Sequence, residues 1–316
     1  MTGGESRYGV ALTNLDEPLF DGAEATKRDL IDYLDAVADQ IIAGLADRPL
    51  SVVRVLRGRP PFMQKNVPKY TPPWVRIVQV WAEASKREVS YALCNDRRTL
   101  LWLANQRAVE YHPTLVRAQH WNQPTHLVLD LDPPHADGFG SAVGAAHLVR
   151  QALADARLVG TAKTSGAKGV HVYVPVSEAA TGEEVAAATR AIAVRAEQID
   201  PALATTAYVR ADRAGKVFLD STRSGGATVV AAYSPRIRPG APVSYPVAWE
   251  DLDQVTPADF TVRSAARLIA DGDPWADRMP EPQQLSPELI EEGRAIPVAR
   301  VQAMHEGKRR ARERRG

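Results

Sequence analysis

The sequence contains one cysteine, Cys94, among 316 residues. A single thiol excludes an internal disulfide and suits a reducing compartment, and we expect Cys94 simply to be buried. No uninterrupted apolar run is long enough to cross a bilayer, and none follows the polar residues 1–7. These absences predict a cytoplasmic protein that does not bind a membrane.

The net charge of +1 neither favours nor excludes a nucleic-acid partner, but the charges are unevenly distributed. Residues 53–80 contain no acidic side chain, and aromatic rings are interleaved with their cations. Cations for a phosphate backbone and rings for stacking are typical of a nucleic-acid surface. A proline-rich solvated loop is the alternative. A second basic block, residues 307–316, ends the sequence, and we expect a disordered tail there.

Segments with helical spacing alternate with strand-like segments along the chain. Thr26 is the expected N-cap of a helix that continues to Ala46. Further helices are predicted over residues 100–109, 141–156, 181–198 and 262–270, and strands over 8–12, within 75–93, and over 125–132, 169–176 and 216–220. With 45% hydrophobic residues, this order predicts a mixed α/β (α+β) domain over residues 1–282, followed by a polar C-terminal extension over residues 283–316.

One apolar strand carries two carboxylates. Asp130 and Asp132 alternate with leucines, so the leucines can face a core while both carboxylates leave the opposite face. Two like charges this close favour a cation between them, and Mg²⁺ or Mn²⁺ held by carboxylates commonly binds phosphates. The alternative is a strand that ends in an ordinary turn at Pro133 and Pro134.

Two further segments fit phosphate chemistry. Asp220 ends another apolar strand, and three such aspartates can form a two-metal site, although spacing alone does not establish that link. In residues 164–171, glycines flank Lys168, so backbone N–H groups can turn toward an anion while the lysine adds charge. This segment is not a Walker loop, and a tight glycine turn with an exposed lysine is the alternative.

Four motifs together resemble one family. They are Leu-Asp-Leu-Asp-Pro at 129–133, Ser-Gly-x-Lys-Gly-x-His at 165–171, Arg-x-Gly-Lys-Val-Phe-x-Asp at 213–220 and Tyr-Ser-Pro-Arg at 233–236. They occur in this order in the archaeo-eukaryotic primase superfamily. Over residues 12–273 the chain resembles the polymerase domain of the bacterial end-joining ligase D and its stand-alone primase-polymerase relatives.

The resemblance implies a fold and an activity. The fold is a mixed-sheet primase-polymerase core, a single globular domain with two sheet-containing modules. The activity is template-directed extension of a primer 3′-hydroxyl with NTPs, ribonucleotides favoured, by two-metal catalysis with Mn²⁺ or Mg²⁺. Primed, gapped or broken double-stranded DNA is the implied partner, in gap filling or end repair, with a separate DNA ligase and an end-binding protein as further candidates. The implied location is the bacterial cytoplasm, at the nucleoid.

The resemblance also implies roles for individual residues. The metal-binding and catalytic triad is Asp130, Asp132 and Asp220. The nucleotide-binding residues are His112, Ser165, Lys168, Gly169, His171, Arg213 and Arg236, with His112 associated with ribose recognition. The nucleic-acid-binding residues are Asn14, Lys27, Arg54, Phe62 and Lys65.

The chain departs from the family pattern at four places. Glu17 and Val53 stand where the ligase-linked domains usually have lysines that bind the 5′-phosphate at a gap. Phe62-Met63 replaces an aromatic pair. Residues 221–224, Ser-Thr-Arg-Ser, replace the usual Trp-Ser-Gln-Asn, a change that bears on nucleotide selectivity.

Two other function classes fit part of the pattern. A phosphatase of the haloacid dehalogenase class would use Asp130 as nucleophile and Asp132 as acid/base, together with Thr164 and Lys168. Pro133-Pro134 is unusual after those aspartates, and the basic aromatic segment has no use in such an enzyme. The other alternative is a non-catalytic nucleic-acid-binding module of the same fold.

Overall fold

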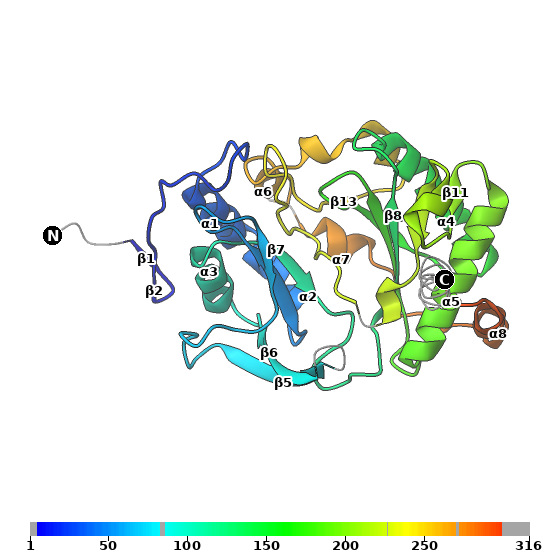
Figure 1. Cartoon of the computed structure of the whole chain (residues 1–316), viewed down its shortest axis with the longest axis horizontal. Coiled ribbons are helices and arrows are strands. Elements are labelled where there is room, and N and C mark those ends of the chain that lie inside the picture. The colour runs from blue at the N-terminus through cyan, green and yellow to red at the C-terminus, as the bar shows by residue number, and fades with distance from the viewer. Residues whose placement is uncertain (1–4, 83–85, 226, 270–271, 299–316) are drawn as a thin grey trace, which may run out of the picture.

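The chain folds around two main β-sheets, which lie in the two halves of the molecule (Figure 1). The structure is a computed structural model, and it describes residues 5–82, 86–225, 227–269 and 272–298. The basic tail expected over residues 307–316 lies outside these ranges. None of the helices within them is long and apolar enough to span a membrane.

The larger sheet has six strands and holds the acidic strand near its centre. In order across the sheet, the strands are β11 (Ala204–Thr205), β12 (Val217–Asp220), β8 (His126–Asp132), β10 (Val170–Pro175), β9 (Thr161–Thr164) and β13 (Pro246–Val247). The β11–β12 pair is parallel and the other pairs are antiparallel, so the sheet is mixed.

Two long helices, α4 (Phe139–Asp155) and α5 (Gly182–Ile199), cover one face of this sheet (Figure 1). Leu127, Leu129 and Leu131 are fully buried in the same core as the apolar residues of both helices. Burying three leucine side chains stabilises the fold by roughly 5–9 kcal/mol before opposing terms. The alternation along β8 therefore fixes which face carries the carboxylates.

The smaller sheet lies with the N-terminal helices. Its path is β4 (Phe62–Gln64), β3 (Leu50–Arg54), β6 (Arg87–Leu93) and β5 (Arg76–Ala82), and β7 (Ala108–Pro113) also pairs with β3. The nearby helices are α1 (Lys27–Ala36), α2 (Ala38–Leu45) and α3 (Arg97–Asn105). A short hairpin of β1 (Ser6–Arg7) and β2 (Val10–Ala11) precedes them.

The segment 229–247 joins the two sheets. Its backbone bonds to β7 through Ala231 N and Tyr111 O at 2.9 Å, and to the end of β9 through Thr164 N and Tyr245 O at 2.9 Å. Tyr33 of α1 donates to Tyr233 O at 2.8 Å inside the core. Because one segment bonds to both sheets, the two halves share one apolar core.

Most of the expected elements are found close to their predicted positions. The strand expected over residues 8–12 is an exception, because Tyr8 and Gly9, with φ of 48° and 74°, form the turn between β1 and β2. Thr26 caps α1 in a reciprocal capping box with Asp29, although a break at Val37 divides the predicted helix into α1 and α2. The predicted helix 100–109 instead begins at Arg97 and ends at Asn105, because Asp96 caps it and the chain enters β7. The helix expected over 262–270 is only α6 (Ala265–Leu268) within the described residues. Cys94 is fully buried, as expected.

Part of the polar segment after residue 282 is packed against the main fold. Helix α8 (Pro287–Ala295) follows the short α7 (Pro274–Arg278) and lies along α5 (Figure 1). Leu289 and Ile290 belong to the main core. At Gly293 the two helices approach so closely that a Cβ atom would lie 1.9 Å from Ala187 O.

Gly293→Ala tests this packing. We expect the free energy of unfolding to fall by roughly 1–3 kcal/mol, because the added methyl group forces α8 away from α5. Gly44→Ala in α2 is the matched control, since its Cβ meets nothing within 4 Å and should stabilise the protein by up to about 1 kcal/mol. Urea unfolding measures both. Equal stability of Gly293→Ala and the unmodified protein would contradict the close approach.

Candidate active site

The register of β8 and β12 brings the three predicted aspartates to one place. Asp220 lies directly opposite Asp130 in the antiparallel ladder, and Phe218 lies opposite Asp132. Paired residues direct their side chains to the same face, which is the face not covered by α4 and α5. The link between Asp220 and the acidic strand, which spacing alone left open, is therefore present in the fold.

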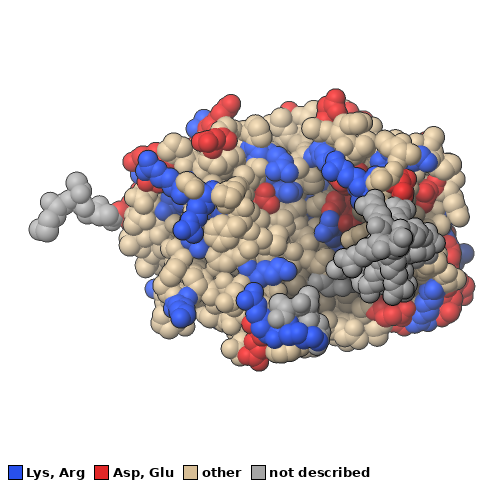
Figure 2. Space-filling view, viewed as in Figure 1, with Lys and Arg blue, Asp and Glu red and all other residues tan. Residues whose placement is uncertain are grey.

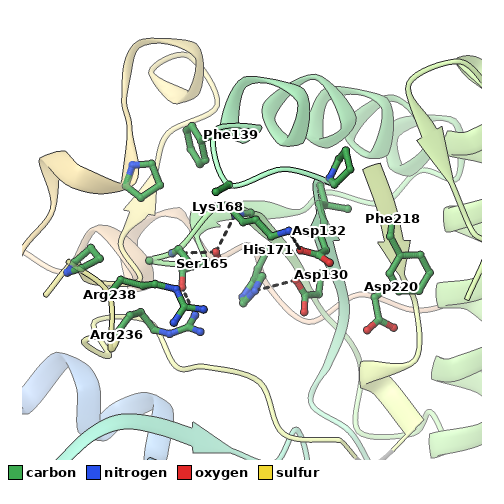
Figure 3. A pocket seen from close by; sticks show the side chains of 18 of the residues that line it. Asp130, Asp132, Phe139, Ser165, Lys168, His171, Phe218, Asp220, Arg236 and Arg238 are labelled. Atoms are coloured by element: carbon green, nitrogen blue, oxygen red, sulfur yellow. Dashed lines mark hydrogen bonds and ion pairs between the residues drawn. The ribbon is translucent and has the colours of Figure 1, made fainter. Parts of the chain in front are cut away.

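The aspartates line a cavity of about 860 Å³ (Figure 3). All the residues predicted to bind metal or nucleotide, except His112, line this cavity. Eight of them do so with their side chains, and the ninth, Gly169, does so with its backbone. The lining also contains residues for which the sequence predicted no site role: Phe139, Arg210, Phe218, Arg223 and Arg238. Figure 2 shows Lys and Arg side chains around the hollow in the middle of this face, with acidic side chains beside them. The cavity therefore suits a highly charged anion.

Asp132 contacts two cations. Its Oδ1 lies 3.0 Å from Lys168 Nζ, and its Oδ2 lies 3.4 Å from Arg213 Nη1. Lys168 also donates to Pro133 O, and the guanidinium of Arg213 stacks 3.8 Å from the centroid of the Phe218 ring. With 44% of its side chain exposed, Asp132 is the most accessible of the three carboxylates.

Asp130 and Asp220 share one arginine. Arg223 Nη2 lies 2.9 Å from Asp130 Oδ2 and 3.0 Å from Asp220 Oδ2. Burial alone would raise the pKa of Asp130, but the hydrogen bond from His171 and the charge of Arg223 outweigh it and hold the pKa well below its usual value. Both carboxylates are therefore paired with the same positive side chain.

The three carboxylates are candidate ligands for a divalent ion. Three carboxylates at neighbouring strand ends are hard oxygen donors of the kind that Mg²⁺ and Mn²⁺ prefer. Within the described ranges, however, no three acidic, histidine or cysteine side chains are gathered closely enough to form a ready metal site. The donor chemistry fits a divalent ion, and a guanidinium occupies the space between two of the donors.

The glycine-flanked segment forms a closed turn. Ser165 Oγ accepts hydrogen bonds from Gly169 N at 3.0 Å and from Ala167 N at 3.2 Å. These N–H groups thus bond within the turn, unlike the anion cradle expected from the sequence. A Cβ on residue 169 would lie 2.3 Å from Leu131 O, so only glycine allows the turn to lie against β8. The turn positions Lys168 beside Asp132 (Figure 3).

His171 is held from both sides. Its Nε2 lies 3.2 Å from Asp130 Oδ1, and its Nδ1 lies 2.9 Å from Nζ of Lys163, its partner in the β9–β10 register. Burial and Lys163 lower the pKa of His171 to about 4. The imidazole is therefore neutral at pH 7, and the lysine donates to Nδ1 while Nε2–H faces Asp130. Lys163 was not singled out from the sequence, and the only signal was a lysine inside an apolar strand.

His112 lies on the smaller sheet, and Glu110 connects it to the cavity. Glu110 Oε2 lies 2.9 Å from His112 Nε2, and Glu110 Oε1 lies 3.2 Å from Arg236 Nε. Glu110 also accepts a hydrogen bond from Ile237 N at 2.9 Å. Burial favours the neutral acid, but the bond from His112 and the charge of Arg236 lower the pKa of Glu110 to about 2. Glu110 therefore aligns two of the predicted nucleotide contacts.

Two of the predicted nucleic-acid residues have buried, internally bonded head groups. Lys27 is 2% exposed, and its Nζ donates to Asn105 Oδ1 at 2.7 Å and to Thr13 O. Arg54 is 8% exposed and donates to Gln106 O and Gln64 Oε1, both at 2.8 Å. The charged groups of Lys27 and Arg54 therefore bond to other groups of the protein.

The other three predicted nucleic-acid residues are exposed. Asn14, with φ of 53°, and Lys65 are on the surface, and Phe62 is 37% exposed. Met63 and Tyr70 are also exposed beside Phe62 in the acid-free segment. Exposed rings and cations fit a nucleic-acid surface, and their exposure alone does not separate it from the alternative of a proline-rich solvated loop.

Known proteins are similar to this chain over most of its length, including the residues that line the cavity. A family model described as the LigD primase-polymerase domain matches residues 26–275. The bifunctional non-homologous end joining protein LigD of Bacillus subtilis is 34% identical over 285 residues, which are 88% of this chain and 46% of that protein. The multifunctional non-homologous end joining DNA repair protein LigD of Mycobacterium tuberculosis is 33% identical over 298 residues, 88% of this chain and 39% of that protein.

A solved structure is similar over most of the fold. It is the polymerase domain of Mycobacterium tuberculosis ligase D in complex with DNA, with a TM-score of 0.77 and 33% identity, covering 85% of this chain and 97% of that chain. The chain spans less than half the length of the curated relatives named here. The mixed sheet, the motif order and these matches agree, and the chain belongs to the LigD primase-polymerase domain family.

Proposed function

We propose that this protein is a template-directed nucleotidyltransferase that extends a primer 3′-hydroxyl with NTPs, ribonucleotides favoured, during gap filling and DNA end repair. The observation that carries the proposal is the convergence of three strand-end carboxylates with Lys168, Arg213 and Arg236 on one cavity, in a member of this family. Non-homologous end joining is the proposed pathway, because the named relatives are end-joining proteins.

In the proposed reaction, the primer 3′-hydroxyl loses its proton to water and its oxygen bonds to the α-phosphorus of the NTP. The bond from the α-phosphorus to the oxygen that bridges to the β-phosphate breaks, and the β- and γ-phosphates leave together as pyrophosphate. Asp130, Asp132 and Asp220 would hold divalent metal, Mn²⁺ or Mg²⁺, which when bound offsets the charge of the phosphates. The two-metal arrangement stays a prediction. The chain's own contribution is alignment and charge: Lys168 and Arg213 reach the cavity beside Asp132 and can bind triphosphate oxygens.

The partners follow from the same proposal. Primed or gapped double-stranded DNA would lie along the exposed group formed by Phe62, Met63, Lys65 and Tyr70, and the base-paired template would select the nucleotide. Joining of the extended ends would require a separate ligase activity, and an end-binding protein is a further candidate. In the similar solved structure the polymerase domain is bound to DNA, which supports DNA as the ligand.

Asp130→Ala and Asp132→Ala test the catalytic assignment. Each should reduce Mn²⁺-dependent primer extension on gapped DNA by about a thousandfold, because charge stabilisation of the phosphates is lost. DNA affinity should change less than about threefold, because phosphate contacts lie mainly elsewhere. Asp137→Ala, on an exposed residue nearby, is the control and should extend normally. Substantial extension by both site variants would refute the assignment. Phosphate release from a simple phosphoester by the unmodified protein, without extension, would favour the phosphatase class.

The 5′-phosphate at a gap should have little effect on binding. Glu17 pairs with Arg107 at 3.3 Å, and the amine of Lys27 bonds to Asn105, so neither of these two cations is free to bind a phosphate. We expect fluorescence anisotropy to give equal affinities, within about twofold, for gapped DNA with and without the phosphate. Glu17→Lys should create a preference of roughly two- to fivefold for the phosphorylated gap. Asp16→Lys makes the same charge change one residue away and should create none. A tenfold preference in the unmodified protein would contradict this prediction.

Glu110→Gln tests the link between His112 and Arg236. Loss of the carboxylate charge should raise the KM for the nucleotide by roughly tenfold with a smaller effect on kcat, because two nucleotide contacts lose a charged hydrogen-bond partner. Steady-state extension kinetics with ATP and dATP measure the effect and the ribose preference. Glu178→Gln, on an exposed residue, is the matched control. An unchanged KM would show that Glu110 does not position these residues.

A further inference from the structure

Arg223 occupies the space between two of the three carboxylates. A single atom, its Nη2, lies 2.9 Å from Asp130 Oδ2 and 3.0 Å from Asp220 Oδ2. Asp130 and Asp220 would also hold a divalent ion, so such an ion would compete with the guanidinium for the same carboxylate oxygens.

The backbone around Arg223 is fixed. Thr222 donates to Asp220 Oδ1 through both its backbone N at 2.9 Å and its hydroxyl at 2.6 Å. Ser224 Oγ accepts from Val128 N of β8 at 3.3 Å and bonds to the Thr189 hydroxyl of α5 at 3.1 Å. Only the side chain of Arg223 has to move for the carboxylates to be released.

The side chain of Arg223 has a route out of this position. It lines the same cavity as Lys168 and Arg213, and 34% of it is exposed. Its Nε is buried and makes no hydrogen bond among the described residues, so the present position of the side chain leaves one donor without a partner. An anion entering the cavity would offer the guanidinium another partner.

We propose that Arg223 is an exchangeable internal cation, which neutralises Asp130 and Asp220 in the metal-free protein and leaves them when a divalent ion binds. This weakens metal binding by the free protein. One extension rests on the proposed function: the displaced guanidinium binds the phosphates of a bound nucleotide. Nucleotide and metal then strengthen each other's binding. The charge of Arg223 thereby reduces metal occupancy in the absence of substrate.

Mn²⁺ titration of the full chain, followed by electron paramagnetic resonance without DNA or nucleotide, tests the exchange. Arg223→Gln should bind Mn²⁺ about tenfold more tightly or better, because a competing charge in contact with both carboxylates is gone. Arg223→Lys keeps the charge and should stay closer to the unmodified protein. Arg238→Gln removes a charge from the same cavity without a carboxylate contact in the described structure, and should change the affinity less than about twofold. Equal Mn²⁺ affinities for Arg223→Gln and the unmodified chain would overturn the proposal.

Thermal unfolding provides a second readout. In EDTA, Arg223→Gln should have a lower Tm than the unmodified protein, because Asp130 and Asp220 then face each other without a counter-charge, and Mn²⁺ should raise its Tm by more. The same Mn²⁺ effect on both proteins would count against the exchange.

The nucleotide experiment begins with the unmodified chain, so its first result does not depend on a variant that folds. A non-hydrolysable NTP analogue should tighten Mn²⁺ binding by the protein beyond the Mn²⁺ that the analogue itself binds, and this effect should shrink in Arg223→Gln. Absence of tightening, with the analogue shown to bind, would overturn the coupling. Because the Mn²⁺ titration alone needs no polymerisation, failure of primer extension would refute the proposed function and leave the exchange to be judged by its own result.

Discussion

The site depends on one structural constraint, the antiparallel register that sets Asp220 opposite Asp130. Two carboxylates facing each other across a ladder are unfavourable unless a positive group lies between them. Arg223 lies between Asp130 and Asp220, and His171 donates a further hydrogen bond to Asp130. Lys168 and Arg213 pair with the neighbouring Asp132. Strand pairing thus concentrates negative charge at this cavity, and the cationic side chains around it balance that charge.

Compensation of this kind connects distant parts of the chain. His171 is held by Lys163 on the neighbouring strand, and Arg236 is held by Glu110 on the other sheet. The segment 229–247, which carries Arg236, bonds to both sheets, so the relative position of the two halves sets the geometry of the proposed nucleotide contacts. A substitution in the smaller sheet can thus act on the cavity without lining it.

The sequence was sufficient to predict what local periodicity and motif order determine. The leucine alternation in β8 predicts the face that carries Asp130 and Asp132, and the four motifs predict the family, which the comparisons confirm. Burial of Lys27 could not be predicted, because the carbonyl and amide oxygens that hold its amine, at Thr13 and Asn105, are far apart in sequence. Arg223 was visible only as a departure from the usual segment after Asp220, since its contact with Asp130 arises from strand pairing.

The close approach of residue 169 to the backbone of β8 has a consequence for how this family is interpreted. A Cβ there would overlap Leu131 O whether or not a ligand is present, so the glycine is required by the packing of the turn against the strand. A relative that had lost all catalytic ability but kept the fold would still need it. Retention of this glycine thus says little about activity, whereas loss of Lys168 or of an aspartate, which the packing does not require in the same way, is the more informative sign of a chain that has become a scaffold.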